Sequence, residues 1–199
     1  MKTILSLCDY SGEWPRPYRE AGYDVIQVDL KRGGDVIELA KHPEDLPPIY
    51  GVLAAPPCTH FTNSGAQYWE AKDADGRTEE LLKVVDACLD IIDYLEPVWW
   101  ALENPVGRLP KLRPQRLGKY QFIFDPCNFG DAYTKKTCLW GTFTPPLPIF
   151  IGGDWWVEPE RVCSQGSWIM TLGGSSERTK ELRSVTPAGF ARAFFLANP

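Results

Sequence analysis

A cysteine follows two prolines at the end of a short apolar run. Residues 51–65 read GVLAAPPCTHFTNSG, so the thiol of Cys58 comes directly after Pro56 and Pro57. Because each proline fixes its backbone φ angle, the pair holds the following residue in a restricted position. A nucleophilic thiol requires such placement and a lowered pKa, whereas most free cysteines are buried and inert. The nearest histidine is His60, two residues away, so the pattern does not require a papain-like pair.

A glutamate ends another apolar run. Residues 98–102 are followed by Glu103, Asn104 and Pro105. Glutamate is rarely buried without a partner or a function. One interpretation is a helix cap or a salt bridge; the other is an acid whose raised pKa lets it protonate a bound ring nitrogen. In the second interpretation Asn104 and Pro105 fix the direction of the carboxyl group.

Polar residues also follow the first two predicted strands. The turn 9–12 (DYSG) comes after the first strand, and Asp29 ends the second. The turn is either an ordinary strand-to-helix connection or a cradle for an adenosine-type cofactor beside a helix N-terminus. Asp29 is equally a surface acid or a ligand of a ribose diol, and Asp35 caps a turn unless a cofactor is bound. Ligands of open α/β sheets bind at the carboxyl ends of the strands, so all these clusters should converge on one edge.

Strands alternate with helices along most of the chain, which predicts an α/β doubly wound sheet. The predicted strands are 3–8, 24–29, 36–39, 51–55, 98–102, 121–124 and 137–143, and the predicted helices are 14–21, 78–95 and 187–197. We expect Thr78 to cap the longest helix. The last two strands are joined too closely for a crossover helix, so one of them should be antiparallel. Residues 144–180 lack periodicity and are interpreted as a short insertion in a single domain, 1–199.

Composition argues against several classes of protein. The six cysteines form no CxxC and no zinc-ligand spacing, which favours a reduced, cytoplasmic protein without a metal site. No apolar segment is long enough for a membrane span, and the first apolar stretch is too short for a signal peptide. A net charge of -5 argues against indiscriminate nucleic-acid binding. Basic residues nevertheless outnumber acidic ones between 106 and 141, which indicates a phosphate-binding edge or a solvated loop.

Taken together, the quoted motifs resemble those of the cytosine-C5 methyltransferases. LCDYSGEW, GVLAAPPCTHFTNSG and ALENPVGRL match the family in this order, and CNFGDAYTKKTCLWG and RSVTPAGFARAFF are similar to the motifs that follow. The resemblance implies a Rossmann-like class I methyltransferase fold, whose mostly parallel sheet has an antiparallel strand near the C-terminus. It also implies S-adenosyl-L-methionine as methyl donor and DNA as partner, with the target cytosine flipped out of the duplex.

The resemblance also implies roles for individual residues. The Cys58 thiolate attacks C6 of cytosine, Glu103 protonates N3, and C5 then takes the methyl group. The implied cofactor-binding residues are Asp9, Tyr10, Ser11, Gly12, Asp29, Asp35, Pro56 and Ser184. The implied substrate-binding residues are Pro57, Asn104, Lys135, Lys136, Arg113 and Arg116. Lys135 and Lys136 stand where the family usually carries arginines, and lysine offers a point charge without a bidentate fork.

The space for target recognition is small. Members of the family that recognise a DNA sequence carry a sizeable region where this chain has 144–180, so the chain resembles compact, phage-type members. Two alternatives remain open at this point. The same chemistry on RNA or on a free cytosine nucleotide is favoured by the acidic net charge. A non-catalytic nucleic-acid or cofactor-binding module is disfavoured because both Cys58 and Glu103 are present.

Overall fold

The structure is a computed structural model of the chain and describes residues 1–148, 169, 172 and 176–199. Most of the predicted insertion at 144–180, including Cys163, lies outside these residues. Within the described part, six strands form one sheet in the order β2-β1-β3-β4-β6-β5. The strands are β1 (Thr3–Leu7), β2 (Asp24–Val28), β3 (Gly51–Ala54), β4 (Trp99–Pro105), β5 (Phe122–Phe124) and β6 (Thr137–Thr142).

The directions of the strands confirm the predicted fold class. β2, β1, β3 and β4 run parallel, and β6 lies antiparallel between β4 and β5. The close connection between the last two strands therefore produces the predicted antiparallel pair. The sheet is Rossmann-like, mostly parallel with a reversed strand near the C-terminus.

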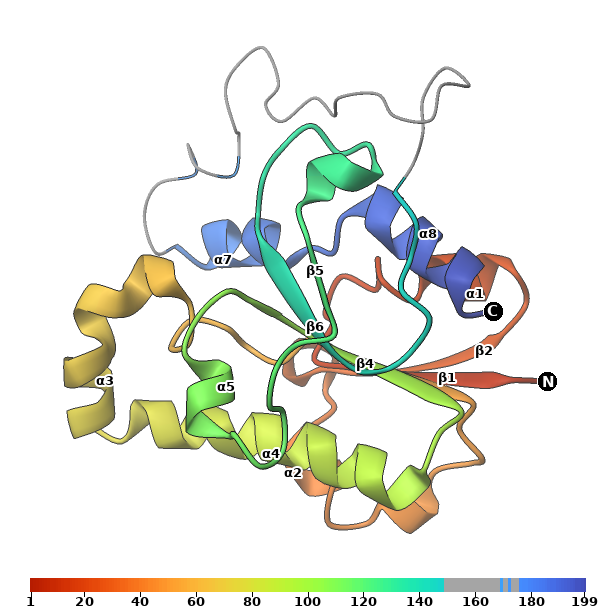
Figure 1. Cartoon of the computed structure of the whole chain (residues 1–199). Coiled ribbons are helices and arrows are strands. Elements are labelled where there is room, and N and C mark those ends of the chain that lie inside the picture. The colour runs from red at the N-terminus through yellow and green to blue at the C-terminus, as the bar shows by residue number, and fades with distance from the viewer. Residues whose placement is uncertain (149–168, 170–171, 173–175) are drawn as a thin grey trace.

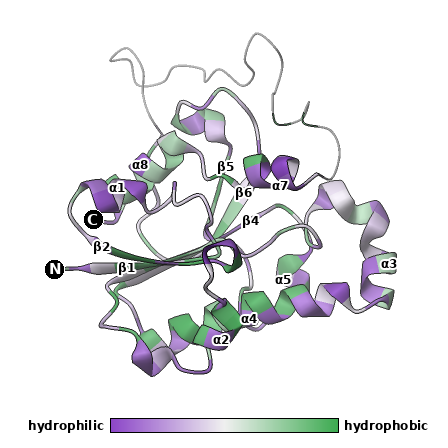
Figure 2. Cartoon of the chain, turned by 180° about the vertical axis from the view of Figure 1, so that it is seen from behind, coloured by the Kyte–Doolittle hydropathy of each residue, from purple (hydrophilic) through white to green (hydrophobic). Residues whose placement is uncertain are grey.

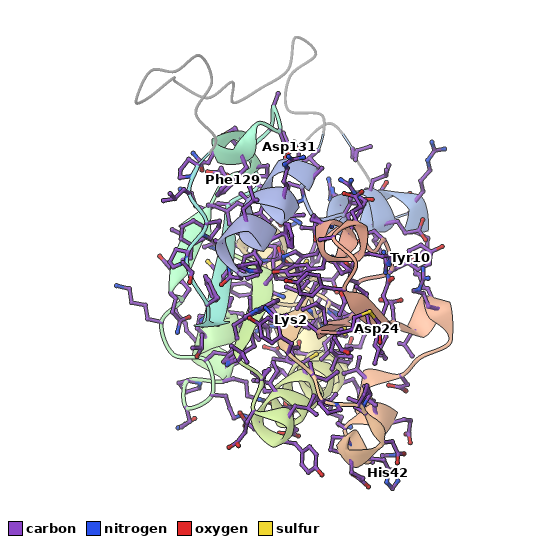
Figure 3. All side chains as sticks on the ribbon, turned by 90° about the vertical axis from the view of Figure 1, so that its right-hand side faces the viewer. Lys2, Tyr10, Asp24, His42, Phe129 and Asp131 are labelled. Carbon is purple, nitrogen blue, oxygen red and sulfur yellow. The ribbon has the colours of Figure 1, made fainter. Side chains whose placement is uncertain are left out.

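Helices cover both faces of the sheet (Figure 1). α2 (Val36–Leu39), α4 (Arg77–Leu95) and α5 (Leu109–Leu112) lie on one face, and α1 (Arg16–Glu20) and α8 (Ala188–Ala197) lie on the other. Figure 2 shows the apolar stripe of α4 turned toward the sheet. In Figure 3 Phe129 and Asp131 lie on the α8 side, whereas His42 lies on the opposite side. Because parallel strands are covered on both faces, all residues of β1 and β3 are buried.

Two further helices lie beyond the carboxyl ends of the parallel strands in Figures 1 and 2. They are α3 (Trp69–Ala74), which follows the Cys58 loop, and α7 (Glu177–Ser184), which the sequence did not indicate. Four 3-10 turns complete the described elements: η1 (Leu30–Arg32), η2 (Pro43–Asp45), η3 (Asn63–Tyr68) and η4 (Pro126–Phe129). Among the described helices, none is both long and apolar enough to cross a membrane.

Three local predictions were wrong. Val36–Leu39 is a helix and not a strand, because the Asp35 side chain accepts a hydrogen bond from the Ile37 backbone N–H and starts a helical turn. Thr78 does not cap α4: Gly76 is the cap residue, in a left-handed conformation. β4 continues through Pro105, so Glu103 and Asn104 lie within the strand and not after it.

Candidate active site

The carboxyl ends of three neighbouring strands bring the predicted catalytic groups to one edge of the sheet. Leu7 of β1 pairs with Ala54 of β3, and Ala54 pairs with Leu102 of β4. The DYSG turn begins two residues after Leu7, the Pro-Pro-Cys segment begins two residues after Ala54, and Glu103 is the residue after Leu102. Their convergence is thus a consequence of strand register, because parallel strands in register end side by side.

Cys58 lies in a turn that two sets of hydrogen bonds hold. The fully buried Asn104 donates from Nδ2 to the Pro56 carbonyl, at 3.0 Å. On the other side of the thiol, the backbone N–H groups of Phe61 and Thr62 donate to the Cys58 carbonyl, at 2.9 and 3.2 Å. The two prolines and these bonds restrict the position of the half-buried sulfur.

The electrostatic environment of Cys58 includes two other predicted site residues. Burial raises the pKa of the Cys58 thiol, the Lys135 ammonium lowers it, and the Glu103 carboxylate raises it. His60 is buried, and its Nδ1 lies 3.4 Å from the Thr78 hydroxyl on α4. The histidine ring therefore contacts α4, and the structure offers no papain-like cysteine–histidine pair here.

The environment of Glu103 favours the protonated form of its carboxyl group. Its side chain is 17% exposed, and Oε1 lies 3.9 Å from Lys135 Nζ. Burial raises the pKa of the Glu103 carboxyl, Lys135 lowers it, and Asp9 raises it. Because burial comes first among these causes, Glu103 is protonated at higher pH than an exposed glutamate, as a proton donor to a ring nitrogen requires.

Lys135 and Tyr133 complete this cluster from the loop before β6. Lys135 Nζ also donates to the Arg183 carbonyl near the end of α7, at 2.9 Å. Tyr133 is buried, and burial, Asp131 and Glu103 together raise the pKa of its hydroxyl. Tyr133 was missed in the sequence, although it stands two residues before Lys135 in the matched motif. Lys136 is exposed, one residue before β6.

The DYSG turn has an unused acceptor. Asp9 is buried, and its Oδ1 accepts hydrogen bonds from Ser11 Oγ at 2.7 Å and from the Gly12 backbone N–H at 2.9 Å. Its Oδ2 is buried without a hydrogen-bond partner among the described residues. Gln27, which the sequence analysis missed, donates to the Asp9 and Tyr10 carbonyls and holds the turn against β2. A buried carboxylate oxygen without a partner fits a ligand that is cationic or donates a hydrogen bond.

The other predicted cofactor residues have local roles as well. One oxygen of Asp29 accepts from the Lys31 backbone N–H, and one oxygen of Asp35 accepts from that of Ile37, so both cap short helical turns. Ser184 ends α7, and its hydroxyl donates to the Glu181 carbonyl at 2.8 Å. The capping of Asp35 agrees with one of the interpretations made for it; cofactor contacts of these three residues stay predictions.

α7 is tied across the edge of the sheet. Lys31, which follows β2, forms ion pairs with Glu177 and Glu181 at 2.5 and 2.8 Å, and its ammonium lies 5.5 Å from the Tyr10 ring centroid. Tyr10 is 45% exposed. These contacts, together with the bond from Lys135 to Arg183, place α7 beside both the DYSG turn and the cluster of Glu103 and Lys135.

Arg113 and Arg116 are engaged elsewhere. Arg113 pairs with Asp86 at 2.8 Å and with Glu79 at 3.2 Å. Arg116 pairs with two further carboxylates of α4, those of Asp90 and Asp93. Neither guanidinium is brought to the Cys58–Glu103 cluster by these contacts. Phosphate binding by the two arginines stays a prediction, and it requires exchange of these ion pairs.

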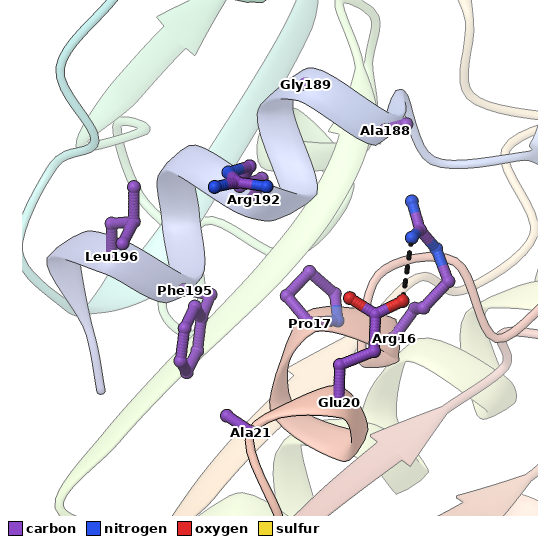
Figure 4. A pocket seen from close by; sticks show the side chains of 9 residues that line it. All are labelled: Arg16, Pro17, Glu20, Ala21, Ala188, Gly189, Arg192, Phe195 and Leu196. Carbon is purple, nitrogen blue, oxygen red and sulfur yellow. Dashed lines mark hydrogen bonds and ion pairs between the residues drawn. The ribbon is translucent and has the colours of Figure 1, made fainter.

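A cavity of about 340 Å³ reaches Tyr133 but is not lined by Cys58, Glu103 or Lys135. It is lined by residues of three matched motifs: Glu13 after the DYSG turn, Asp131 and Tyr133 before β6, and Val185, Thr186 and Pro187 before α8. A cavity of about 460 Å³ lies between α1 and α8 (Figure 4) and contains none of the predicted site residues. In the described part of the chain, no group of three or more His, Cys, Asp or Glu side chains could hold a metal ion.

Comparisons with known proteins identify no family. No protein-family model matches the chain, and no curated protein matches it. Among solved structures, one that is similar is a candidate DNA modification methyltransferase encoded within a prophage of E. coli, with a TM-score of 0.46 and 16% identity over 71% of this chain. The chain spans 46% of the length of that protein. The fold assignment rests on the sheet order and strand directions described above.

Proposed function

We propose that the protein transfers a methyl group from S-adenosyl-L-methionine to C5 of cytosine in DNA through a covalent adduct on Cys58. The observation that carries the proposal is the Cys58–Glu103–Lys135 cluster at the carboxyl edge of the sheet. Glu103 lies 3.9 Å from Lys135, and both charges act on the pKa of the Cys58 thiol. A thiol nucleophile, a carboxylic acid and an ammonium group that influence one another electrostatically suit the addition of the thiol to a pyrimidine ring.

The chemistry follows from these side chains. The Cys58 thiolate forms a bond to C6 of the cytosine, while Glu103 donates its proton to N3, so that negative charge does not build up on the ring. Lys135 stabilises the thiolate before attack and the Glu103 carboxylate after proton transfer. After C5 has gained the methyl group, a water molecule takes up the C5 proton, and the C6–sulfur bond breaks with its electron pair returning to the Cys58 thiolate. N3 returns its proton to Glu103, which restores the aromatic ring and the starting state of the enzyme. The restricted turn of Cys58 orients the sulfur for attack.

The residues of the DYSG turn fit the methyl donor. S-adenosyl-L-methionine supplies an electrophilic methyl group when bound. Asp9 offers a buried oxygen without a partner among the described residues, and Tyr10, Ser11 and Gly12 form the turn around it. Asp29, Asp35, Pro56 and Ser184 would complete the binding residues that the family resemblance implies.

A second substrate class is supported by one observation. Arg113 and Arg116, the predicted phosphate contacts, are ion-paired with carboxylates of α4. A polymer that needs few phosphate contacts, or a free cytosine nucleotide, agrees with this pairing and with the net charge of -5. The chemistry at Cys58 and Glu103 would be the same.

The test is methyl transfer from tritiated S-adenosyl-L-methionine to duplex DNA, single-stranded DNA, RNA and cytosine nucleotides, with mass spectrometry for 5-methylcytosine. We expect Cys58→Ser to abolish transfer and Glu103→Gln to lower the rate about 10²- to 10⁴-fold. Cys127→Ser, which changes a buried cysteine of η4, is the control. Full activity of Cys58→Ser would refute the covalent step.

A second measurement detects the adduct itself. In DNA whose target base is 5-fluorocytosine, the fluorine at C5 cannot leave as a proton does, so the C6–sulfur bond should persist. We expect a stable protein–DNA adduct on the Cys58 peptide, formed only when the methyl donor is present. An adduct on another cysteine would contradict the assignment.

A further inference from the structure

We propose that Arg108 is a positioning residue that holds the Cys58 loop against the strand that carries Glu103. The inference rests on the proposed function and adds a role for Arg108, a residue of the ALENPVGRL segment to which the family resemblance assigned none. Arg108 is five positions after Glu103 in the chain and is 9% exposed. An arginine is rarely buried to this degree unless its charge is paired and its N–H groups are bonded.

The guanidinium of Arg108 uses every nitrogen. Nη1 and Nη2 donate to the two oxygens of Asp73 on α3, at 2.6 and 2.7 Å. Nε donates to the His60 carbonyl at 3.0 Å, and Nη2 also donates to the Thr78 hydroxyl at 3.1 Å. The group stacks on the Trp69 ring, 4.6 Å from its centroid. One side chain therefore joins the Cys58 loop, α3 and the start of α4.

The backbone next to Arg108 makes the same connection. The Arg108 N–H donates to the Phe61 carbonyl at 2.8 Å, and Gly107 forms an antiparallel bridge with Thr62. A Cβ atom on Gly107 would lie 1.8 Å from the Phe61 carbonyl oxygen, so only glycine permits this approach. The segments 60–63 and 106–108 therefore lie in direct backbone contact.

One further hydrogen bond connects the residues that Arg108 contacts to the backbone of Cys58. Phe61, whose carbonyl accepts from Arg108, donates its own N–H to the Cys58 carbonyl at 2.9 Å. A shift of Arg108 therefore moves the turn that carries the sulfur. Asn104 holds the chain before Cys58 through Pro56, and Arg108 holds the chain after it. The loop is fixed on both sides by residues of the segment that contains Glu103.

Lysine cannot replace arginine in this arrangement. The ammonium group of lysine is a point donor, whereas the planar fork of arginine serves both Asp73 oxygens and leaves Nε for the His60 carbonyl. The Arg108 hydrogen bonds lower the pKa of the Asp73 carboxyl to about 2, so the ion pair persists at neutral pH. Arg108→Lys therefore removes the fork and retains the charge.

The experiment measures the reactivity of the Cys58 thiol, which does not depend on methyl transfer. Full-length wild type, Arg108→Lys and Asp73→Asn are alkylated with iodoacetamide between pH 6 and 10, and the Cys58 peptide is quantified by mass spectrometry. Hydrogen exchange of residues 59–64 is followed in parallel. The control is Asp75→Asn, which breaks the exposed pair with Arg77 close to Asp73.

We expect alkylation of Cys58 to be about tenfold faster in Arg108→Lys, because a loop that has lost charge-assisted bonds opens more often. Since burial raises the pKa of this thiol, the midpoint of the pH profile should also move to lower pH. Exchange at 59–64 should accelerate, and kcat should fall about tenfold or more with KM for the methyl donor unchanged. Asp75→Asn should stay within about twofold of wild type in every measurement.

The outcomes separate the two proposals. If Arg108→Lys and Asp73→Asn, both folded by circular dichroism, alkylate and exchange like the Asp75→Asn control, the positioning role is refuted even in an active enzyme. If wild type transfers no methyl group to any substrate, the proposed function fails, and the alkylation and exchange data still decide whether Arg108 holds the loop. If Arg108→Lys does not fold, Asp73→Asn decides alone, with an expected alkylation rate at least about threefold above the control.

Discussion

Asn104 connects β4 to the Cys58 loop, and Asn104→Ala tests whether that connection matters. The asparagine is 0% exposed, and its Nδ2 donates to the Pro56 carbonyl at 3.0 Å. In the variant this bond is lost and the carbonyl of the buried Pro56 has no donor. The chain after Cys58 keeps its bonds to Arg108, so the change acts on the preceding prolines only.

The magnitude follows from this geometry. One neutral hydrogen bond contributes about 1 kcal/mol to the free energy of unfolding, and a buried acceptor without a donor costs about 1–3 kcal/mol. The Asn104 Oδ1 is itself buried without a hydrogen-bond partner among the described residues, and its removal relieves part of that cost. We therefore expect Asn104→Ala to lower the free energy of unfolding by about 1–2 kcal/mol.

The expected effect on activity is larger than the effect on stability. Release of the Pro56 carbonyl lets the sulfur of Cys58 move, and a misplacement of about 1 Å can cost about 10²-fold in rate. The free energy of unfolding is measured by urea titration at 25 °C, and kcat by methyl transfer. Both are compared with those of Asn198→Ala.

Asn198 is a matched control because it is a buried asparagine of the α8 end. It donates to the Thr144 and Phe194 carbonyls and accepts from the Thr144 N–H at 2.7 Å. With three bonds lost, its substitution should destabilise the fold at least as much and should leave kcat within about threefold. The reasoning is wrong if Asn104→Ala changes the unfolding free energy by less than about 0.5 kcal/mol, or if both variants lose activity equally.

Two further predictions concern the charge and the close backbone contact at the site. Lys135 lowers the pKa of both the Cys58 thiol and the Glu103 carboxyl, so Lys135→Met should raise both. In the proposed mechanism Cys58 acts deprotonated and Glu103 protonated, so both limbs of the kcat/KM–pH profile should move to higher pH; a shift to lower pH would contradict this. Gly107→Ala would place a Cβ atom 1.8 Å from the Phe61 carbonyl oxygen. We expect it to lower the free energy of unfolding, measured by urea titration, by about 2 kcal/mol or more. The control is Gly65→Ala, whose Cβ atom would lie 3.7 Å from its nearest neighbour and which should change that free energy by less than about 1 kcal/mol.

Local sequence patterns predicted most of the elements because their signals lie within a few residues. The buried strand β3 and the long amphipathic helix α4 were expected within a few residues of their observed bounds. Val36–Leu39 was mistaken for a strand because a segment of four residues is too short for its hydrophobic pattern to distinguish a helix from a strand. Asp35 was interpreted as a turn cap from the sequence, but the strand prediction did not take the cap into account; in the structure its bond from the Ile37 N–H starts the helical turn.

α7 was missed for a different reason. Its sequence ERTKELRS is almost entirely polar and shows no apolar face. Long-range ion pairs from Lys31 to Glu177 and Glu181 hold it at the edge of the sheet. The partners in these pairs are 146 and 150 positions apart, so the pairs leave no local pattern in the sequence.

The sequence by itself determined which residue types follow the strands, and strand register then determined that Cys58, Glu103 and the DYSG turn share one edge. Only the tertiary structure decided which charges are available there. Arg113 and Arg116 pair with α4, whereas Lys135 faces Glu103 and Arg108 binds Asp73. The physical reason is that the hydrophobic pattern of neighbouring residues determines where a strand begins and ends. The partner of a charged side chain depends instead on which distant segments of the chain pack against it.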